Sequence, residues 1–403
     1  MSYHFSKSVG ALRSSAIRDL MSIATRTDII SFAGGMPGNE LFPVDALREM
    51  MQTMPLTQLQ EGMQYGPTGG YPPLLDALKE RLRKKGFPVE TNGLIITTGS
   101  LQALNILGKL FVNPGDTVLT ENPVFIGGVS AFSQYEANIT GIDLDEDGIS
   151  IEQLKTALIQ KPKFLYITPN FHNPAGIVYS RERRVQLIET LRDTDVPIIE
   201  DDAYGELFFD EDTCQISRPM KTWVDADMDK QIFYTGSFSK VFGPGLRIAW
   251  ALTPPEVCNK MSICKQSIDA CSPMLSQVLM YEFMRTGRLE PYIDFLRKTY
   301  KQRRDMMLDA IERYFPKEVT FVNPRGGFYL WLKMPQGIDE ELLFHNVLDK
   351  GAVFVLGGVF DPHGKKNGYI RLSYCNTPED QIERGIKIIG SCLKEMLVNI
   401  KHV

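Results

Sequence analysis

The sequence predicts an α/β fold, in which a mostly parallel sheet is wrapped by helices and is joined to a smaller α+β C-terminal domain. Between residues 94 and 200, short apolar runs of strand length alternate with helical patterns, which is typical of a parallel sheet. After a long amphipathic stretch at 289–313, the pattern changes to short strands mixed with two helices. The chain of 403 residues is also long enough for two domains.

Composition narrows the class of protein. Hydrophobic residues make up 43% of the chain and charged residues 23%, which is ordinary for a globular protein. The net charge is −5, so the composition gives no sign of the basic surface that binds nucleic acid. No apolar run reaches the roughly 18 residues of a membrane span, and no secretory signal pattern opens the chain. The six cysteines form no CxxC pair and do not cluster with the five histidines, so we expect reduced thiols, no metal site and a cytoplasmic location.

The domain organisation follows from these patterns. We expect residues 1–44 to form an N-terminal arm that belongs to the small domain, residues 45–285 to form the large domain, and residues 286–403 to form the small C-terminal domain. The arm contains a helical stretch at 14–23. Arg18 lies within that stretch, and a solvated arginine is the ordinary interpretation of such a position.

Two turn-rich segments follow the arm. A glycine- and proline-rich cluster at 34–38 contains Gly35, and a second loop at 64–70 contains Tyr65. Helices are predicted at 43–54 and 72–85 on either side of the second loop.

The next segment has the pattern of an anion site. A short apolar strand at 94–98 is followed by a glycine, Ser100 and Leu101, which open a helix that continues over 103–112. Free backbone amides at a helix N-terminus point one way, and the helix dipole favours negative charge there. An ordinary serine N-cap explains the same residues equally well.

Polar residues then follow two predicted strands of the parallel sheet. Asn173 lies just past the strand at 164–168, while Asp201 and Tyr204 follow the strand at 196–200. Ligands of such sheets bind at the carboxyl ends of the strands. Asn173 also stands in an Asn-Pro-Ala-Gly sequence, for which a simple turn is the alternative.

Lys240 lies between two further strand-like runs, at 231–235 and 247–252. Most lysines at a strand-to-loop junction are solvated turn residues, but this one is framed by the hydroxyls of Ser237 and Ser239 and by Arg247. A lysine amine forms Schiff bases with carbonyl compounds, and an arginine fork binds anions. The combination indicates a phosphorylated aldehyde, pyridoxal 5′-phosphate.

That cofactor gives the neighbouring motifs a role. The Asp201 carboxylate can pair with the pyridine nitrogen and keep it protonated, which makes the ring an electron sink, although these residues alone do not distinguish Asp201 from the adjacent Asp202. Asn173 and Tyr204 can both hydrogen-bond the phenolic oxygen. The lysine motif also favours phosphate binding, mainly through backbone N–H groups, at Ser100 and Leu101.

The C-terminal segment has the pattern of the smaller α+β domain. Strands are predicted at 318–322, 327–334, 352–356 and 369–374, with helices at 340–349 and 378–398. Arg371 stands among the apolar residues of the last strand, and a charge so placed needs a partner. A structural ion pair is one possibility.

The lysine motif resembles that of a known family. Ser-Phe-Ser-Lys at 237–240 followed by Gly-Pro-Gly-Leu-Arg at 243–247 is similar to the signature of the fold-type-I, pyridoxal-phosphate-dependent aminotransferases of class I/II. Further motifs occur in the family's order from residue 34 to residue 371, and the chain most resembles the 2-aminoadipate/kynurenine subgroup. The resemblance implies amino-group transfer, with Lys240 as the catalytic residue, between an aromatic, branched or dicarboxylic L-amino acid and a 2-oxo acid such as 2-oxoglutarate.

The resemblance also assigns roles that the residues alone do not. It implies that Gly35 and Asn173 line the substrate pocket, and that Arg371 binds the substrate carboxylate. Phe125 would stack on the cofactor ring, with a plain core position as the rival interpretation. Tyr65 would reach across a homodimer to the cofactor phosphate of the partner, so that the active sites are shared. The composition of the arm, which has few large apolar residues, separately suggests that it is weakly packed and can change position, so we expect Arg18 to contact the distal carboxylate of dicarboxylic substrates.

Two other functions remain open at this stage. A lyase or decarboxylase on the same scaffold would consume the amino acid without an oxo-acid acceptor. A transcription regulator with an aminotransferase-like domain would carry a basic helix-turn-helix module before the motif region, where we expect only an arm of about 34 residues.

Overall fold

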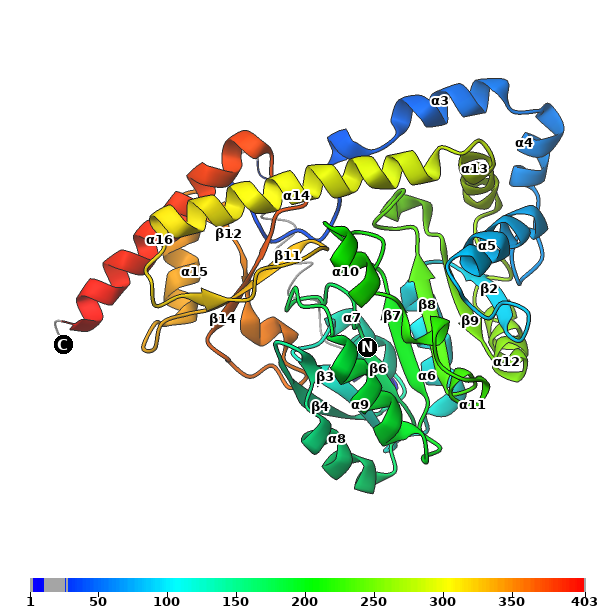
Figure 1. Cartoon of the computed structure of the whole chain (residues 1–403), viewed down its shortest axis with the longest axis horizontal. Coiled ribbons are helices and arrows are strands. Elements are labelled where there is room, and N and C mark those ends of the chain that lie inside the picture. The colour runs from blue at the N-terminus through cyan, green and yellow to red at the C-terminus, as the bar shows by residue number, and fades with distance from the viewer. Residues whose placement is uncertain (1–2, 11–25, 27, 402–403) are drawn as a thin grey trace.

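The computed structural model describes residues 3–10, 26 and 28–401, and it has the predicted architecture. A large sheet covered by helices occupies one part of the molecule, and a smaller group of strands and helices occupies the other (Figure 1). The long helix α14 runs across both parts (Figure 1).

The helices and strands have the following bounds. The helices are α1 (Lys7–Gly10), α3 (Val44–Thr53), α4 (Leu56–Met63), α5 (Pro72–Lys84), α6 (Ser100–Phe111), α7 (Ile126–Ser133), α8 (Ile151–Ala157), α9 (Arg181–Leu191), α10 (Glu211–Ile216), α11 (Ala226–Asp229), α12 (Pro255–Gln266), α13 (Met274–Arg285), α14 (Leu289–Tyr314), α15 (Glu340–Asp349) and α16 (Glu379–Lys401). The strands are β1 (Ile30–Ser31), β2 (Gly93–Thr97), β3 (Thr117–Asn122), β4 (Asn138–Asp145), β5 (Gly148–Ile149), β6 (Leu165–Ile167), β7 (Ile198–Asp202), β8 (Ile232–Ser237), β9 (Ala249–Thr253), β10 (Thr320–Phe321), β11 (Tyr329–Lys333), β12 (Ala352–Val353), β13 (Val355–Leu356) and β14 (Tyr369–Ser373).

The large sheet has eight strands in the order β2-β9-β8-β7-β6-β3-β4-β5. Its centre, from β4 to β8, is parallel, and β9 runs antiparallel between β8 and β2. Every residue of β8 is buried, because helices cover both faces of a sheet of this kind. The carboxyl ends of β6, β7 and β8 therefore meet at one edge.

The smaller part is built around an antiparallel sheet in the order β10-β11-β14-β13. The N-terminal segment joins this part of the molecule, because β1 pairs in parallel with β12. Phe32 also accepts a hydrogen bond, through its carbonyl, from the backbone N–H of Ser373 (2.9 Å). The segment that leads to Gly35 is thus fixed beside β14, which carries Arg371.

Several boundaries differ from those that the sequence indicated. Strand β7 runs on to Asp202 and so includes Asp201, because both residues pair with β8. The segment expected as one strand at 352–356 is divided between two partners, with β12 on β1 and β13 on β14. Helix α4 was not expected. The helix expected at 14–23 lies outside the described residues.

One negative finding concerns membranes. Within the described part of the chain, no helix combines the length and the apolar character needed to cross a bilayer.

Candidate functional site around Lys240

The site residues come together where β7 and β8 end. Asp201 and Thr235 are paired neighbours on these strands, and Ser237 is the last residue of β8. Lys240 follows three residues later, in a turn that leads to Arg247 and β9. The topology therefore collects at one edge of the sheet residues that are far apart in the sequence.

Lys240 has no acidic partner in the described part of the chain. Its Nζ donates a hydrogen bond to the carbonyl of Gly35 (2.7 Å) and lies 5.7 Å from the centre of the Tyr204 ring. No carboxylate of the described residues forms an ion pair with it. Desolvation lowers the pKa of Lys240 to about 8, with a smaller contribution in the same direction from Arg371 and Arg247, although the nearby Cys375 thiol acts in the opposite direction.

Asp201 is the matching buried anion. The hydroxyl of Thr235 donates to Oδ1 (2.7 Å), and the hydroxyl of Tyr166 donates to Oδ2 (2.9 Å). Burial raises the pKa of Asp201 to about 6, and these two hydrogen bonds oppose the rise. Among the described residues no cation pairs with this carboxylate, so it suits a ligand atom that carries positive charge.

The helix N-terminus of α6 meets Arg247. Gly99 precedes the helix with φ of +84°, and a Cβ at that position would collide with the Arg247 guanidinium. Arg247 itself has a left-handed backbone (φ +57°), a strained conformation that is common at functional sites. Ser237 donates to the Ser239 hydroxyl nearby (2.9 Å). Ser100 and Leu101 are the first two residues of α6. Their backbone amides therefore lie at the helix end that is next to Arg247.

Arg371 is buried and makes only neutral hydrogen bonds. Its two Nη atoms donate to Asn173 Oδ1 (2.8 Å) and to the carbonyl of Ala33 (2.7 Å), while Nε has no partner. Its guanidinium carbon lies 4.4 Å from the centre of the Tyr329 ring and 4.7 Å from the centre of the Phe360 ring. The alternative of a structural ion pair finds no carboxylate in the described parts of the chain.

The other predicted residues are more widely distributed. Gly35 lies against the hydroxyl of Tyr329, where a Cβ would collide, and Tyr204 donates to or accepts from the same hydroxyl (2.9 Å). Phe125 is half-buried, which argues against the plain core interpretation. Tyr65 is 84% exposed, and Arg18 lies outside the described residues.

Sequence reasoning missed the residues that hold the site in place. Thr235 could have been found, because side chains alternate along a strand and Thr235 shares a face with Ser237. Tyr166 and Tyr329 had no such signal, since they approach Asp201 and Tyr204 from other strands.

A buried polar network below Asn173 was also missed. Glu121 of β3 accepts hydrogen bonds from Thr168 Oγ1 (2.9 Å) and Tyr179 (2.6 Å), and contacts His172 Nε2 (3.0 Å). Because His172 Nδ1 accepts from the backbone N–H of Ala175 (3.1 Å), Nε2 carries the proton that is donated to Glu121. The network fixes the segment that presents Asn173.

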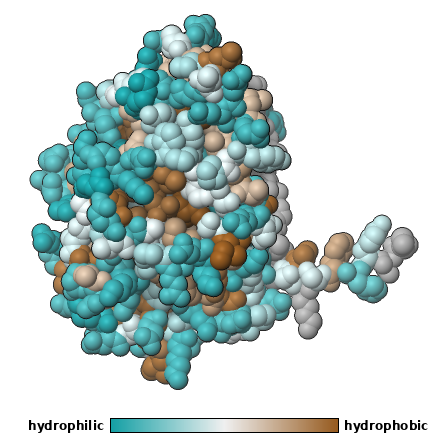
Figure 2. All heavy atoms as spheres, turned by 90° about the vertical axis from the view of Figure 1, so that its right-hand side faces the viewer, coloured by the Kyte–Doolittle hydropathy of each residue, from teal (hydrophilic) through white to brown (hydrophobic). Residues whose placement is uncertain are grey.

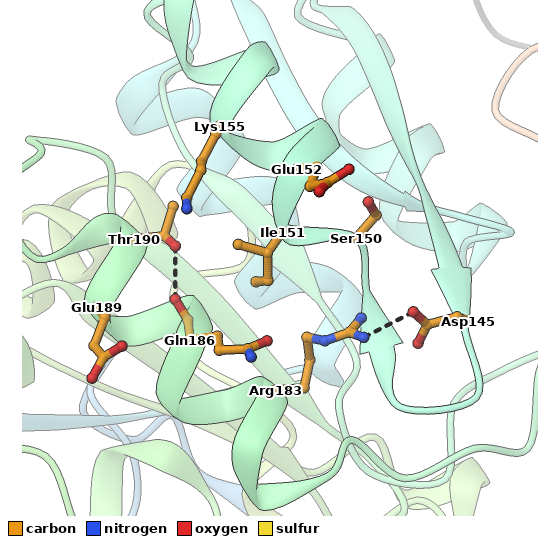
Figure 3. Close-up of a pocket in the computed structure, with 9 residues that line it drawn as sticks. All are labelled: Asp145, Ser150, Ile151, Glu152, Lys155, Arg183, Gln186, Glu189 and Thr190. Carbon is orange, nitrogen blue, oxygen red and sulfur yellow. Dashed lines mark hydrogen bonds and ion pairs between the residues drawn. The ribbon is translucent and has the colours of Figure 1, made fainter.

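A separate cavity of about 610 Å³ lies between α8 and α9 (Figure 3). Its lining mixes both charges, and Arg183 pairs with Asp145 across part of it (2.8 Å). None of the predicted site residues lines this cavity, so we place no function there.

Comparison with known proteins decides the family. Residues 27–389 match the family model described as aminotransferase class I and II. The chain belongs to this family. An aromatic-amino-acid aminotransferase of Thermococcus litoralis is 35% identical over 97% of this chain and 94% of its own length.

Two solved structures are similar in fold and sequence. The kynurenine aminotransferase of Pyrococcus horikoshii, in complex with PMP, has a TM-score of 0.90 and 35% identity, and covers 98% of this chain and 97% of its own. The α-aminoadipate aminotransferase of Thermus thermophilus, complexed with N-(5′-phosphopyridoxyl)-L-leucine, has a TM-score of 0.86 and 34% identity over 98% of both chains. This aminotransferase therefore uses pyridoxal 5′-phosphate, and the lyase alternative finds no support.

The residues present fit that cofactor. The aldehyde needs an amine, and Lys240 supplies one with a depressed pKa. The ring nitrogen needs an anion, and Asp201 is a buried carboxylate for which the described residues supply no cationic partner. The phosphate needs donors, and Arg247 adjoins the N-terminus of α6 across Gly99.

The first prediction concerns the pH dependence of cofactor attachment. The neutral amine is the nucleophile, and a lysine with a pKa of about 8 is about one-tenth neutral at pH 7. The rate at which the cofactor-free protein attaches pyridoxal phosphate should rise with pH and level off above about pH 8. Stopped-flow absorbance measures this rate, and a rate that stays flat from pH 6.5 to 9 would contradict the prediction.

The second prediction separates the two adjacent aspartates. Asp201→Asn keeps the shape of the side chain but removes its charge, so it should slow loss of the substrate Cα proton at least about a hundredfold. Asp202→Asn is the matched control, because Asp202 accepts from Tyr234 and from the backbone of Gly205 instead. Single-turnover kinetics with an α-deuterated amino acid compare the two variants. A larger loss in Asp202→Asn would assign the role to Asp202.

Proposed function

We propose that this aminotransferase is a fairly broad enzyme that transfers the amino group of aromatic, branched or dicarboxylic L-amino acids to 2-oxo acids such as 2-oxoglutarate. The observation that carries the proposal is Arg371, a buried guanidinium with an unpartnered Nε and no carboxylate partner among the described residues. Such a group suits the α-carboxylate that all these substrates share. The aromatic, kynurenine and α-aminoadipate names of the relatives support the substrate range.

The cofactor would be held by residues with distinct tasks. Those proposed for the phosphate are Ser100, Leu101, Ser237, Ser239 and Arg247, with Tyr65 from a partner subunit. Asp201 would pair with the ring nitrogen, Phe125 would cover a ring face, and Asn173 and Tyr204 would hydrogen-bond the phenolic oxygen. When bound, pyridoxal phosphate supplies the electron sink for the reaction.

The remaining steps belong to the protein. Arg371 and Asn173 hold the substrate carboxylate and so orient the Cα–H bond. Lys240 would hold the cofactor through its amine, and the same amine, once free, would take the proton from Cα as a general base. Its lowered pKa suits this task, because a base works best when its pKa lies near the working pH.

A half-reaction screen tests this function. Each amino acid is mixed with the holoenzyme without an oxo acid, and the change in cofactor absorption and the 2-oxo acid formed are measured. We expect stoichiometric turnover that stops after one cycle and resumes on addition of 2-oxoglutarate. Continuous turnover without an acceptor would indicate a lyase, and response to a single substrate class would contradict a broad range.

The third prediction separates the two proposed carboxylate arginines. Arg371→Ala should weaken kcat/KM for all substrates alike, whereas Arg18→Ala should weaken only dicarboxylic ones, by roughly 1.5–3 kcal/mol if a charged hydrogen bond is lost. Arg26→Ala is a matched control in the same arm, because Arg26 pairs with Asp28 (2.6 Å). An unchanged ratio of dicarboxylic to aromatic kcat/KM in Arg18→Ala would place selectivity elsewhere.

We also propose that the enzyme is a homodimer with shared active sites. The face that carries α4, α5 and α12 shows hydrophobic areas among the polar ones (Figure 2). Exposed apolar residues of these helices and of the loop after α4 include Leu56 (70%), Met63 (80%), Tyr65 (84%) and Ile263 (59%). Large exposed apolar patches are typical of protein interfaces.

The fourth prediction is a complementation test of this dimer. A mixture of Lys240→Ala and Tyr65→Ala subunits, dissociated and reassociated, should regain activity, because each hybrid holds one site with an intact lysine and an intact partner tyrosine. Activity assays before and after mixing, with sedimentation to confirm the dimer, measure the gain. No recovery, or an active monomer, would contradict a shared site.

Two further proposals concern location and domains. All six cysteines are free, which suits a reducing compartment such as the cytoplasm.

We propose a large domain over 45–285, with residues 1–44 joining residues 286–403 in the small domain. The pairing of β1 with β12 supports this division.

A further inference from the structure

Tyr329 connects three residues of the proposed site. Its hydroxyl lies 2.9 Å from the hydroxyl of Tyr204, and its ring lies 4.4 Å from the Arg371 guanidinium. The same hydroxyl occupies the space where a side chain at Gly35 would otherwise lie. Tyr329 is fully buried, so these contacts are fixed by packing.

The strand register explains the placement. Arg371 is paired with Trp331 across β11 and β14, and Tyr329 is two residues from Trp331 on the same face. Tyr329 is therefore a diagonal cross-strand neighbour of Arg371, which is within reach of an aromatic side chain. The strand thus carries an aromatic ring to Arg371 and a hydroxyl to Tyr204.

The two hydroxyls must divide the donor and acceptor roles between them. Burial keeps the pKa of both tyrosines above the ordinary value, so both are neutral at physiological pH. A neutral hydroxyl has one proton to donate. If Tyr204 directs its proton to a ligand, the hydrogen bond between the two must be donated by Tyr329.

We propose that Tyr329 is a positioning residue, which donates to Tyr204 and so turns the Tyr204 O–H toward the phenolic oxygen of the cofactor. The inference rests on the role of Tyr204 in the proposed function. Besides Tyr329, the charged or titratable groups near Tyr204 are Lys240, Arg371, Cys375 and Tyr166. Among the described residues, none of these four forms a hydrogen bond with the Tyr204 hydroxyl.

This hydrogen bond should affect the pH at which the absorption spectrum of the bound cofactor changes. A hydrogen-bond donor to the phenolic oxygen stabilises negative charge on that oxygen. The proton on the adjacent nitrogen, which links Lys240 to the cofactor, is then held less strongly and is lost at lower pH. When the donor is weakened, the pH midpoint of the absorption change rises. Tyr329→Phe removes the hydroxyl but keeps the ring against Arg371, so it isolates this effect.

Spectrophotometric pH titration of the holoenzyme tests the proposal in a double-mutant cycle. Tyr329→Phe should raise the midpoint by about half a pH unit, as expected for one neutral hydrogen bond. Tyr204→Phe should raise it further, and adding Tyr329→Phe to Tyr204→Phe should change nothing more. Tyr374→Phe is the matched control, since this buried tyrosine donates to the Gly326 carbonyl (2.9 Å) outside the site, and its midpoint should equal that of the wild type.

Each other outcome overturns the proposal in a recognisable way. If Tyr204→Phe shifts the midpoint and Tyr329→Phe does not, Tyr329 has no positioning role and the proposed function stands. If neither variant shifts it, the role of Tyr204 itself fails. An equal shift by Tyr329→Phe in both backgrounds means that it acts by another route. Should Tyr329→Phe fold poorly, 3-fluorotyrosine at position 329, a stronger donor, should lower the midpoint, and an unchanged or raised midpoint would overturn the proposal.

Discussion

The proposed active site depends on a lysine amine that is withdrawn from water and that has no carboxylate beside it among the described residues. In most proteins a partly buried lysine is paired, and pairing would keep it charged and unreactive. Lys240 instead contacts the Gly35 carbonyl and lies near two arginines. Its depressed pKa thus depends on several parts of the chain, because the N-terminal segment supplies Gly35, β14 supplies Arg371, and the loop after β8 supplies Arg247.

The same principle extends to the rest of the site, which consists of charges that lack partners within the described chain. Asp201 is a buried anion without a cation, and Arg371 is a buried cation without an anion, whereas Arg247 is exposed. Unpaired buried charges are costly, so the protein alone does not satisfy them. A zwitterionic substrate and a phosphorylated pyridine supply the missing charges, and we therefore regard ligand binding as the completion of this electrostatic arrangement.

The sheet and several site residues could be predicted from the sequence, whereas contacts that depend on strand register could not. The alternation of strands and helices predicted the sheet, and motifs at strand ends predicted Asp201, Asn173 and Lys240, because strand ends of parallel sheets meet at one edge. Tyr329 could not be found in the same way, since its proposed role arises from the register of β11 on β14 and leaves no local pattern. The split of the strand at 352–356 was equally hidden, because it depends on pairing with the distant arm.

The central claim is that Lys240 carries the cofactor. Borohydride reduction of the holoenzyme, followed by proteolysis and mass spectrometry, tests it most directly, because reduction makes the link to the lysine permanent. We predict a single phosphopyridoxyl group, on the peptide that contains Lys240. A label on another lysine, or none on this peptide in a protein that is active before reduction, would contradict the account.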